Sequence, residues 1–166
     1  MPIKQKITTY LWFDNQAEEA MNFYVSIFKN SKVLGVTRYG EAGPGPKGSV
    51  MIGTFQLEGQ QFIALNGGPH FKFNEAISLQ IMCKSQEEID RYWEKLGAGG
   101  DPKAQVCGWL KDKYGLSWQV APEGMEEMYA DVDSPGASRV MEAMLKMKKL
   151  DMEALKEAYE GETARR

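Results

Sequence analysis

The chain has 166 residues, 43% of them hydrophobic and 26% charged, which is ordinary for a soluble globular protein of one domain or two closely joined halves. The net charge of −3 and the single basic cluster of Lys146, Lys148 and Lys149 argue against a nucleic-acid partner, because phosphate-binding surfaces need clustered Lys and Arg. No signal segment or membrane-length apolar run is present, so we expect a cytoplasmic protein with no membrane partner.

The first half of the chain predicts a strand, a helix and three further strands. Residues 7–13 are β-branched and aromatic, which favours a strand. Apolar residues of 17–28 recur at spacings of three and four, which is typical of an amphipathic helix. A strand is expected at 32–39, a Gly- and Pro-rich loop at 40–48, and a hairpin at 49–57 and 60–66 around Glu58-Gly59.

The second half starts with a strand at 76–83 and a helix that runs to Leu96. Ser85 and Glu88 have the spacing of a capping box, in which each side chain binds a helix-end amide of the other residue. A closing hairpin is expected at 106–110 and 116–121, with a charged turn at 111–114. Trp118 and Gln119 then point to opposite faces of the last strand, because side chains alternate along a strand.

The two halves have the character of an internal repeat. Glu18-Glu19 and Phe23-Tyr24 align with Glu87-Glu88 and Tyr92-Trp93, and the order of elements recurs. We therefore expect a first module at 1–68, a linker and a second, shortened module at 69–123, and a C-terminal helical extension at 124–166.

The extension predicts two amphipathic helices. Ser134-Pro135 is a favourable start for the first, and Asp151 caps the second. Their apolar stripes should be buried against a dimer partner or the back of a sheet, or should form a lid over a ligand.

A literal match to the dinucleotide fingerprint occurs at 43–48, but its chemistry does not fit. Pro44 and Pro46 have no N–H to offer a pyrophosphate, and a strand follows instead of a helix. A mobile hairpin loop is the better interpretation. The same absence argues against an adenosylmethionine-dependent methyltransferase with a doubly wound sheet.

Candidate ligand-binding residues come from the predicted strands. Gln119 could face a pocket together with Ser78 and Gln80, which would form a polar wall within apolar surroundings. Trp12 and Trp109 could be apolar walls of the pocket. The structural alternatives are a glutamine satisfied by backbone groups and tryptophans that belong to the core.

The single histidine and the two cysteines have open roles. His70, the single histidine, is either a solvated loop residue or, if the linker crosses a pocket mouth, a general base or metal ligand. Cys83 and Cys107 lack metal-site spacing and are expected to be reduced thiols. For Cys107 a structural thiol is favoured over a nucleophile.

Several motifs resemble the PhnB-like branch of the glyoxalase/bleomycin-resistance/dioxygenase superfamily, also called vicinal oxygen chelate proteins. The resemblance covers nearly the whole chain, and the motifs that carry it lie at residues 8–14, 18–24, 65–69, 107–122 and 144–151. The resemblance implies an α+β fold of two paired βαβββ modules whose sheets curl into cups, and a homodimer. This branch is often labelled 3-demethylubiquinone-9 3-methyltransferase, an activity that none of these residues supports.

Metal-dependent members of the superfamily use inward-facing His or Glu on the first and last strands of each module. The last ligand position corresponds to Gln119 here, and the resemblance places the others at non-ligating residues: Thr9, Ile77 or Ser78, and Ile63, Ala64 or Asn66. Because the sequence departs from the family's ligand pattern at these positions, we expect a protein with no metal ligand set and no cofactor. A divalent metal whose coordination is completed by water remains an alternative.

Three hypotheses follow from these residues. The first is a metal-free homodimer that binds a small, partly apolar molecule in the cup through Gln119, Ser78 and Gln80. The second is a lyase, isomerase or oxygenase acting on vicinal oxygens, with a metal held by Gln119, His70 and water. The third is a structural or interaction protein with vestigial cups.

Overall fold

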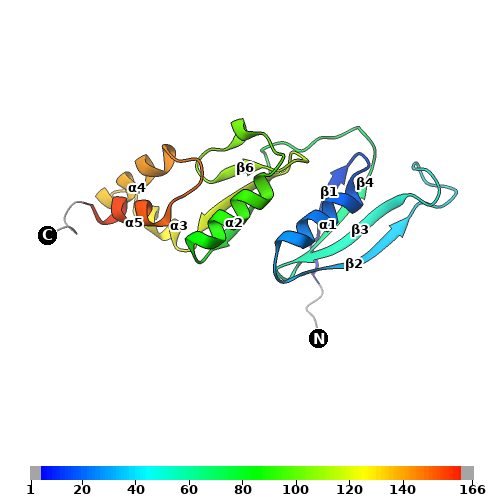
Figure 1. Cartoon of the computed structure of the whole chain (residues 1–166), viewed down its shortest axis with the longest axis horizontal. Helices are drawn as coiled ribbons and strands as arrows, with labels where there is room; N and C mark the ends of the chain where they lie inside the picture. The colour runs from blue at the N-terminus through cyan, green and yellow to red at the C-terminus, as the bar shows by residue number, and fades with distance from the viewer. Residues whose placement is uncertain (1–4, 162–166) are drawn as a thin grey trace. The chain divides into compact units, whose positions relative to one another are not determined.

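The computed structural model describes residues 5–161, and the chain divides between Phe73 and Asn74 into two compact units. Each unit has one mixed sheet with a helix across one face, and the second also carries three C-terminal helices (Figure 1). The α+β fold with two curled mixed sheets and C-terminal helices is confirmed. Among the described residues, no helix is both long and apolar enough to cross a bilayer.

The first sheet follows the predicted order of elements. Its strands lie in the order β1-β4-β3-β2, with β1 parallel to β4 and the other neighbours antiparallel. Helix α1 (Ala17–Ile27) connects β1 to β2. The strands are β1 (Thr9–Phe13), β2 (Ser31–Arg38), β3 (Val50–Leu57) and β4 (Gln60–Asn66). They differ from the predicted ranges only at their ends.

Helix α1 closes one face of this sheet. The ring of Tyr24 stacks on Phe55 of β3, with ring centroids 6.2 Å apart. Met21 lies over Gly53, where an added Cβ would be 2.7 Å from its sulfur, so only glycine allows this approach. On β1, alternation leaves Tyr10 and Trp12 on the opposite, more exposed face.

Asn66, the last residue of β4, joins three segments of the first unit. Its Oδ1 accepts a hydrogen bond from the Ala17 N–H at 2.8 Å, and its Nδ2 donates to the Val50 carbonyl at 3.1 Å. Its own carbonyl accepts from the Tyr39 hydroxyl at 2.6 Å. Because Gln16 supplies no side-chain cap, this amide from a distant strand satisfies the first turn of α1.

The Gly- and Pro-rich loop is closed by Tyr39. The Tyr39 N–H donates to the Ser49 carbonyl at 2.8 Å, and the Tyr39 carbonyl accepts from the Gly48 N–H at 2.9 Å. The ring lies so close to Gly43 and Gly45 that a Cβ at either position would be 2.4 Å from a ring carbon. Strand β3 follows the loop, so the fingerprint match has no helix N-terminus with which to bind a phosphate.

The second sheet repeats this arrangement with one strand fewer. Its order is β5-β7-β6, with β5 parallel to β7 and β6 antiparallel to β7. The elements are β5 (Ser78–Cys83), α2 (Gln86–Gly97), the 3-10 turn η1 (Pro102–Ala104), β6 (Trp109–Lys111) and β7 (Ser117–Pro122). The shortened module has no counterpart of β2 among its described residues, because the glycine-rich stretch before η1 turns instead of extending.

The strand predicted over 106–110 is wrong in its first part. Cys107 and Gly108 have φ angles of 51° and 82° and form a two-residue turn. Across this turn Val106 and Trp109 exchange both backbone hydrogen bonds, so regular pairing starts only at Trp109. Gly108 was the available signal, but cysteine is not among the residues that favour the first position of such a turn.

The charged turn at 111–114 is built around a buried carboxylate. Asp112 is only 2% exposed. Its Oδ1 accepts hydrogen bonds from the N–H groups of Tyr114 and Leu116, and its Oδ2 accepts from the indole N–H of Trp118 at 2.9 Å. The side chain therefore satisfies turn amides and joins the turn to β7, a role that the sequence pattern did not predict.

The C-terminal extension packs within the second unit. Its helices are α3 (Met125–Tyr129), α4 (Pro135–Leu145) and α5 (Met152–Glu160). Val140, Leu150 and Leu155 are buried together with Ala121 and Met125, so the stripes are covered in part within the chain. Met141 and Leu145 of α4 and Tyr159 of α5 stay exposed. Asp151 caps α5 as predicted, whereas the Ser134 side chain makes no capping bond to α4.

The segment before α5 is held from two sides. The N–H groups of Cys107 and Gly108 donate to the carbonyls of Met147 and Lys148 at 2.9 and 2.8 Å. The two amides of the tight turn are thereby used to dock the extension onto the hairpin.

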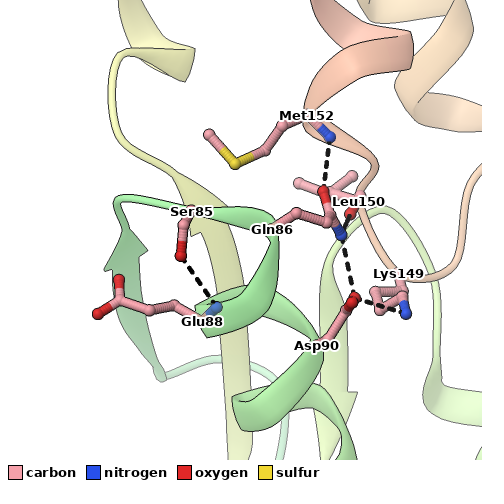
Figure 2. Close-up of polar contacts among 7 residues, drawn as sticks. All are labelled: Ser85, Gln86, Glu88, Asp90, Lys149, Leu150 and Met152. Carbon is pink, nitrogen blue, oxygen red and sulfur yellow. Dashed lines mark hydrogen bonds and ion pairs between the residues drawn. The ribbon is translucent and has the colours of Figure 1, made fainter.

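On the other side, Gln86 in the first turn of α2 holds the same segment (Figure 2). Its Nε2 donates to the Leu150 carbonyl at 3.1 Å, and its Oε1 accepts from the Met152 N–H at 2.9 Å. Asp90, one turn further along α2, accepts from Gln86 and pairs with the Lys149 ammonium. A side-chain amide thus pairs with the backbone as a neighbouring strand would.

The predicted capping box at the start of α2 forms in part. The Glu88 N–H donates to Ser85 Oγ at 3.2 Å, which is the expected half of the motif (Figure 2). The Glu88 carboxylate accepts from the Lys84 N–H at 2.8 Å instead of from Ser85.

Candidate functional site

Strand register gathers polar side chains on one face of the second sheet. Gln80, Gln119 and Trp109 lie side by side across β5, β7 and β6. Two residues along each strand, a second row crosses the same three strands and consists of Ser78, Ser117 and Lys111. Paired residues share a face, so these six residues form one surface, here called the polar face: Ser78, Gln80, Trp109, Lys111, Ser117 and Gln119.

The opposite face of this sheet is apolar. Leu110, Trp118 and Val120 are all buried on the side that carries α2. Trp118 and Gln119 therefore do point to opposite sides, as the alternation predicted.

The predicted polar wall is connected in the structure. Gln119 is half-buried, and its Nε2 donates to Ser78 Oγ at 2.9 Å. Trp109, the register partner of Gln119, is also half-buried, and Gln80 is exposed. The structure thus brings together Gln119, Ser78, Gln80 and Trp109 on one surface.

A hollow of about 420 Å³ opens beside the polar face, within the range of small-molecule sites. Trp109, Lys111 and Ser117 belong to both the hollow and the polar face. The other lining residues come from the chain before β5, from η1, from the tight turn and from β6: Glu75, Lys103, Ala104, Val106, Cys107 and Leu110.

Charge in this hollow is set by lysines and one carboxylate. The Lys111 ammonium pairs with Glu75, and this hydrogen bond lowers the pKa of the Glu75 carboxyl below its ordinary value. Lys103 lines the same hollow and adds a second positive charge. Sequence reasoning missed Glu75, Lys111 and Ser117, although Ser117 is two residues before Gln119 and so lies on its face.

The remaining predicted residues, His70 and Trp12, belong to the first unit. His70 is exposed and lines a separate hollow of about 670 Å³, together with Asp14, Glu18 and Arg38. Trp12 does not line it. Its indole N–H donates to the Gly68 carbonyl at 2.9 Å, which holds the chain after β4 against β1.

The side chains of the polar face do not fit a transition-metal centre. It offers two neutral amides, two hydroxyls and an ammonium, whereas such metals are held by imidazole, thiolate or carboxylate. Within residues 5–161, no three His, Cys, Asp or Glu side chains gather closely enough to hold a metal ion.

The two thiols lie in different surroundings. Cys107 is half-buried and lines the hollow, while Cys83 is fully buried at the end of β5. Burial raises the pKa of the Cys83 thiol to about 12, and the charges of Glu88 and Glu123 add to the effect.

Cys83 should make folding stability fall at high pH. From an ordinary pKa of 9.0 up to about 12, the unfolded thiol ionises while the folded one keeps its proton. The folded state then binds more protons, so the free energy of unfolding decreases as pH rises. We expect Cys83→Ala to reduce this decrease in urea denaturation between pH 8 and pH 10.5; equal pH slopes in the two proteins would contradict the assignment.

Comparison with known proteins places this architecture in a family. The sequence profile described as 3-demethylubiquinone-9 3-methyltransferase matches residues 5–121. The PhnB protein from Bacillus cereus is 44% identical, with 71% of this chain and 99% of that chain covered and a TM-score of 0.62. No curated protein matches the chain.

Two more distant structures share the fold. Protein PA1353 from Pseudomonas aeruginosa is 21% identical, with 72% of this chain and 98% of that chain covered and a TM-score of 0.58. The fosfomycin resistance protein FosX from Listeria monocytogenes, in its monoclinic form at pH 5.75, is 18% identical and has a TM-score of 0.53. The match covers 78% of this chain and 98% of that chain.

The profile match includes both sheets and ends before α3, so it covers the polar face and leaves out the C-terminal extension. It confirms the resemblance found in the sequence motifs. The chain belongs to the 3-demethylubiquinone-9 3-methyltransferase family, the PhnB-like branch of the vicinal oxygen chelate superfamily.

Proposed function

We propose that this protein binds a small, partly apolar molecule on the polar face of the second sheet, without a resident metal. The observation that carries the proposal is the Gln119–Ser78 hydrogen bond beside the half-buried indole of Trp109. Among residues 5–161 the Gln119 Oε1 has no hydrogen-bond partner, so it is available to a ligand donor. A few polar groups on an apolar surface are typical of small-molecule sites.

A methyltransferase activity is not part of the proposal, although the family name contains it. A conventional adenosylmethionine site uses a doubly wound parallel sheet with a glycine-rich first turn. The two sheets described here are small and mixed, and their strands are connected differently. The glycine-rich stretch at 43–48 lies between two antiparallel strands.

The proposal can be tested with three aromatic probes, namely phenol, benzamide and benzoate. We expect at least one to shift the NMR signals of the Gln119 amide and the Trp109 indole in a saturable way. Gln119→Leu should weaken that binding roughly tenfold, because it removes a hydrogen bond and leaves Ser78 without its donor. Gln56→Leu, on β3 of the first unit, is the matched control and should leave binding unchanged.

Metal content is measured in the same preparations. We expect less than roughly 0.1 divalent metal ions per protein chain, because neutral amides and hydroxyls are weak ligands for such ions. Stoichiometric metal that is lost in Gln119→Leu would favour the lyase, isomerase or oxygenase alternative. No response to any probe at millimolar concentration would contradict the proposal and favour vestigial cups.

A further inference from the structure

Ser117 carries an unused hydrogen-bonding group in the hollow. It is 1% exposed, and its Oγ has no hydrogen-bond partner among the described residues. A buried hydroxyl without a partner is destabilising, because it has lost its hydrogen bonds to water. An acceptor atom placed in the hollow would satisfy it.

Lys111 lies directly opposite Ser117 on the neighbouring strand. The two residues are paired in register, so their side chains leave the same face from adjacent positions. Lys111 is 26% exposed, and its ammonium already holds a carboxylate, that of Glu75. The site is therefore suited to an oxygen anion between an ammonium and a hydroxyl.

Glu75 is placed to be exchanged for another carboxylate. Its side chain is 64% exposed and it lies in the chain before β5, outside regular structure. Because the Glu75 side chain is mostly in solvent, water screens its attraction to Lys111, so a competing carboxylate has little to overcome. Without Glu75, the hollow would contain two lysines and no acidic lining residue.

The remaining walls suit an apolar body. Trp109, Val106 and Ala104 line the hollow beside the two lysines. Its volume of about 420 Å³ is enough for a compact, drug-fragment-sized molecule. An indole beside a cationic group favours a planar ligand with one charged end.

We propose that the hollow binds a small carboxylate with a planar apolar body, whose carboxylate replaces Glu75 on Lys111 and accepts a hydrogen bond from Ser117. This inference rests on the proposed function, because the hollow and the Gln119 row share the polar face. Beyond the proposed function, the inference specifies that the ligand is negatively charged and that Lys111 and Ser117 select it.

The test compares benzoate with its neutral isostere benzamide. Cys107 lines the same hollow, so the rate of its alkylation by iodoacetamide reports occupancy, and NMR shifts of Trp109 provide a second readout. We expect benzoate to protect Cys107 in a saturable way and to bind roughly tenfold tighter than benzamide, since charge-assisted hydrogen bonds are the stronger ones.

Variants separate charge from packing. Lys111→Met should weaken benzoate roughly tenfold and leave benzamide unchanged, because it keeps an apolar stem and removes the charge. Glu75→Gln should tighten benzoate several-fold by removing the competitor. Ser117→Ala should weaken it about threefold, as expected for one hydrogen bond. Lys113→Met is the control, because exposed Lys113 lies in the same turn but does not line the hollow.

The outcomes distinguish the two proposals. If benzamide binds as tightly as benzoate and Lys111→Met changes neither, the carboxylate assignment is wrong while small-molecule binding stands. If benzoate binds with unchanged affinity in Glu75→Gln, the exchange with Glu75 is wrong. If no probe protects Cys107 or shifts Trp109, both the inference and the proposed function are overturned.

Discussion

Replacement of Asp112 by alanine should lower the free energy of unfolding by about 3–5 kcal/mol, since it removes a buried acceptor that serves several donors. The N–H groups of Tyr114 and Leu116 and the indole N–H of Trp118 would all lose an acceptor. The hydrogen bond between Trp118 and Asp112 is buried, so water does not readily replace the carboxylate. Urea denaturation followed by tryptophan fluorescence measures the loss.

Asp112→Asn tests whether the acceptor chemistry matters more than the shape. Asparagine keeps one oxygen, but its NH₂ group would face either the turn amides or the indole N–H, and two donors repel each other. We expect a loss of about 2–3 kcal/mol for this isosteric change. In a double-mutant cycle with Trp118→Phe the losses should be less than additive; full additivity would show that the Trp118 hydrogen bond does not stabilise the hairpin.

Gly108→Ala should destabilise the second unit by about 2–4 kcal/mol, because it combines backbone strain with a steric clash. Gly108 has a φ of 82°, and an added Cβ would lie 2.9 Å from Leu150 Cδ1 and 3.0 Å from the Val120 carbonyl oxygen. Leu150 belongs to the segment that the turn docks, so the clash should also loosen the C-terminal extension.

Gly115→Ala is the matched control for this prediction. Gly115 has a φ of 87°, close to that of Gly108, but an added Cβ would meet no atom within 4 Å. Its expected cost is therefore the backbone term alone, roughly 1–2 kcal/mol. Hydrogen exchange on α4 and α5 should accelerate in Gly108→Ala and not in Gly115→Ala. Equal destabilisation of the two variants would mean that the packing of Leu150 on Gly108 contributes nothing.

Local patterns identified most of the secondary structure and the family. The spacing of apolar residues located α1, the capping-box spacing of Ser85 and Glu88 located the start of α2, and the alternation through 117–120 correctly placed Trp118 and Gln119 on opposite faces. Such periodicities are local, because they depend only on the geometry of one helix or one strand. The motif around 107–122 is specific enough to indicate the superfamily from the order of its residues alone.

Contacts between distant segments could not be predicted in this way. The approach of Asn66 to the start of α1 and that of Gln86 to Leu150 depend on how elements pack, which no local pattern encodes. Asp112 is a related case, because a charged residue in a turn is ordinarily exposed, whereas this one is buried and accepts a hydrogen bond from the indole N–H of Trp118.

For this protein, the sequence by itself determined most of the strands and helices, the repeated arrangement and the polar character of the last strand. It did not predict the short helix α3 or the tight turn at Cys107-Gly108. The tertiary structure decided which polar residues share a surface. It placed Gln119 beside Ser78, set Lys111 opposite Ser117 and located His70 in the other unit. The physical reason is that alternation fixes which side of a strand a residue faces, whereas strand register, a non-local property, fixes its neighbours.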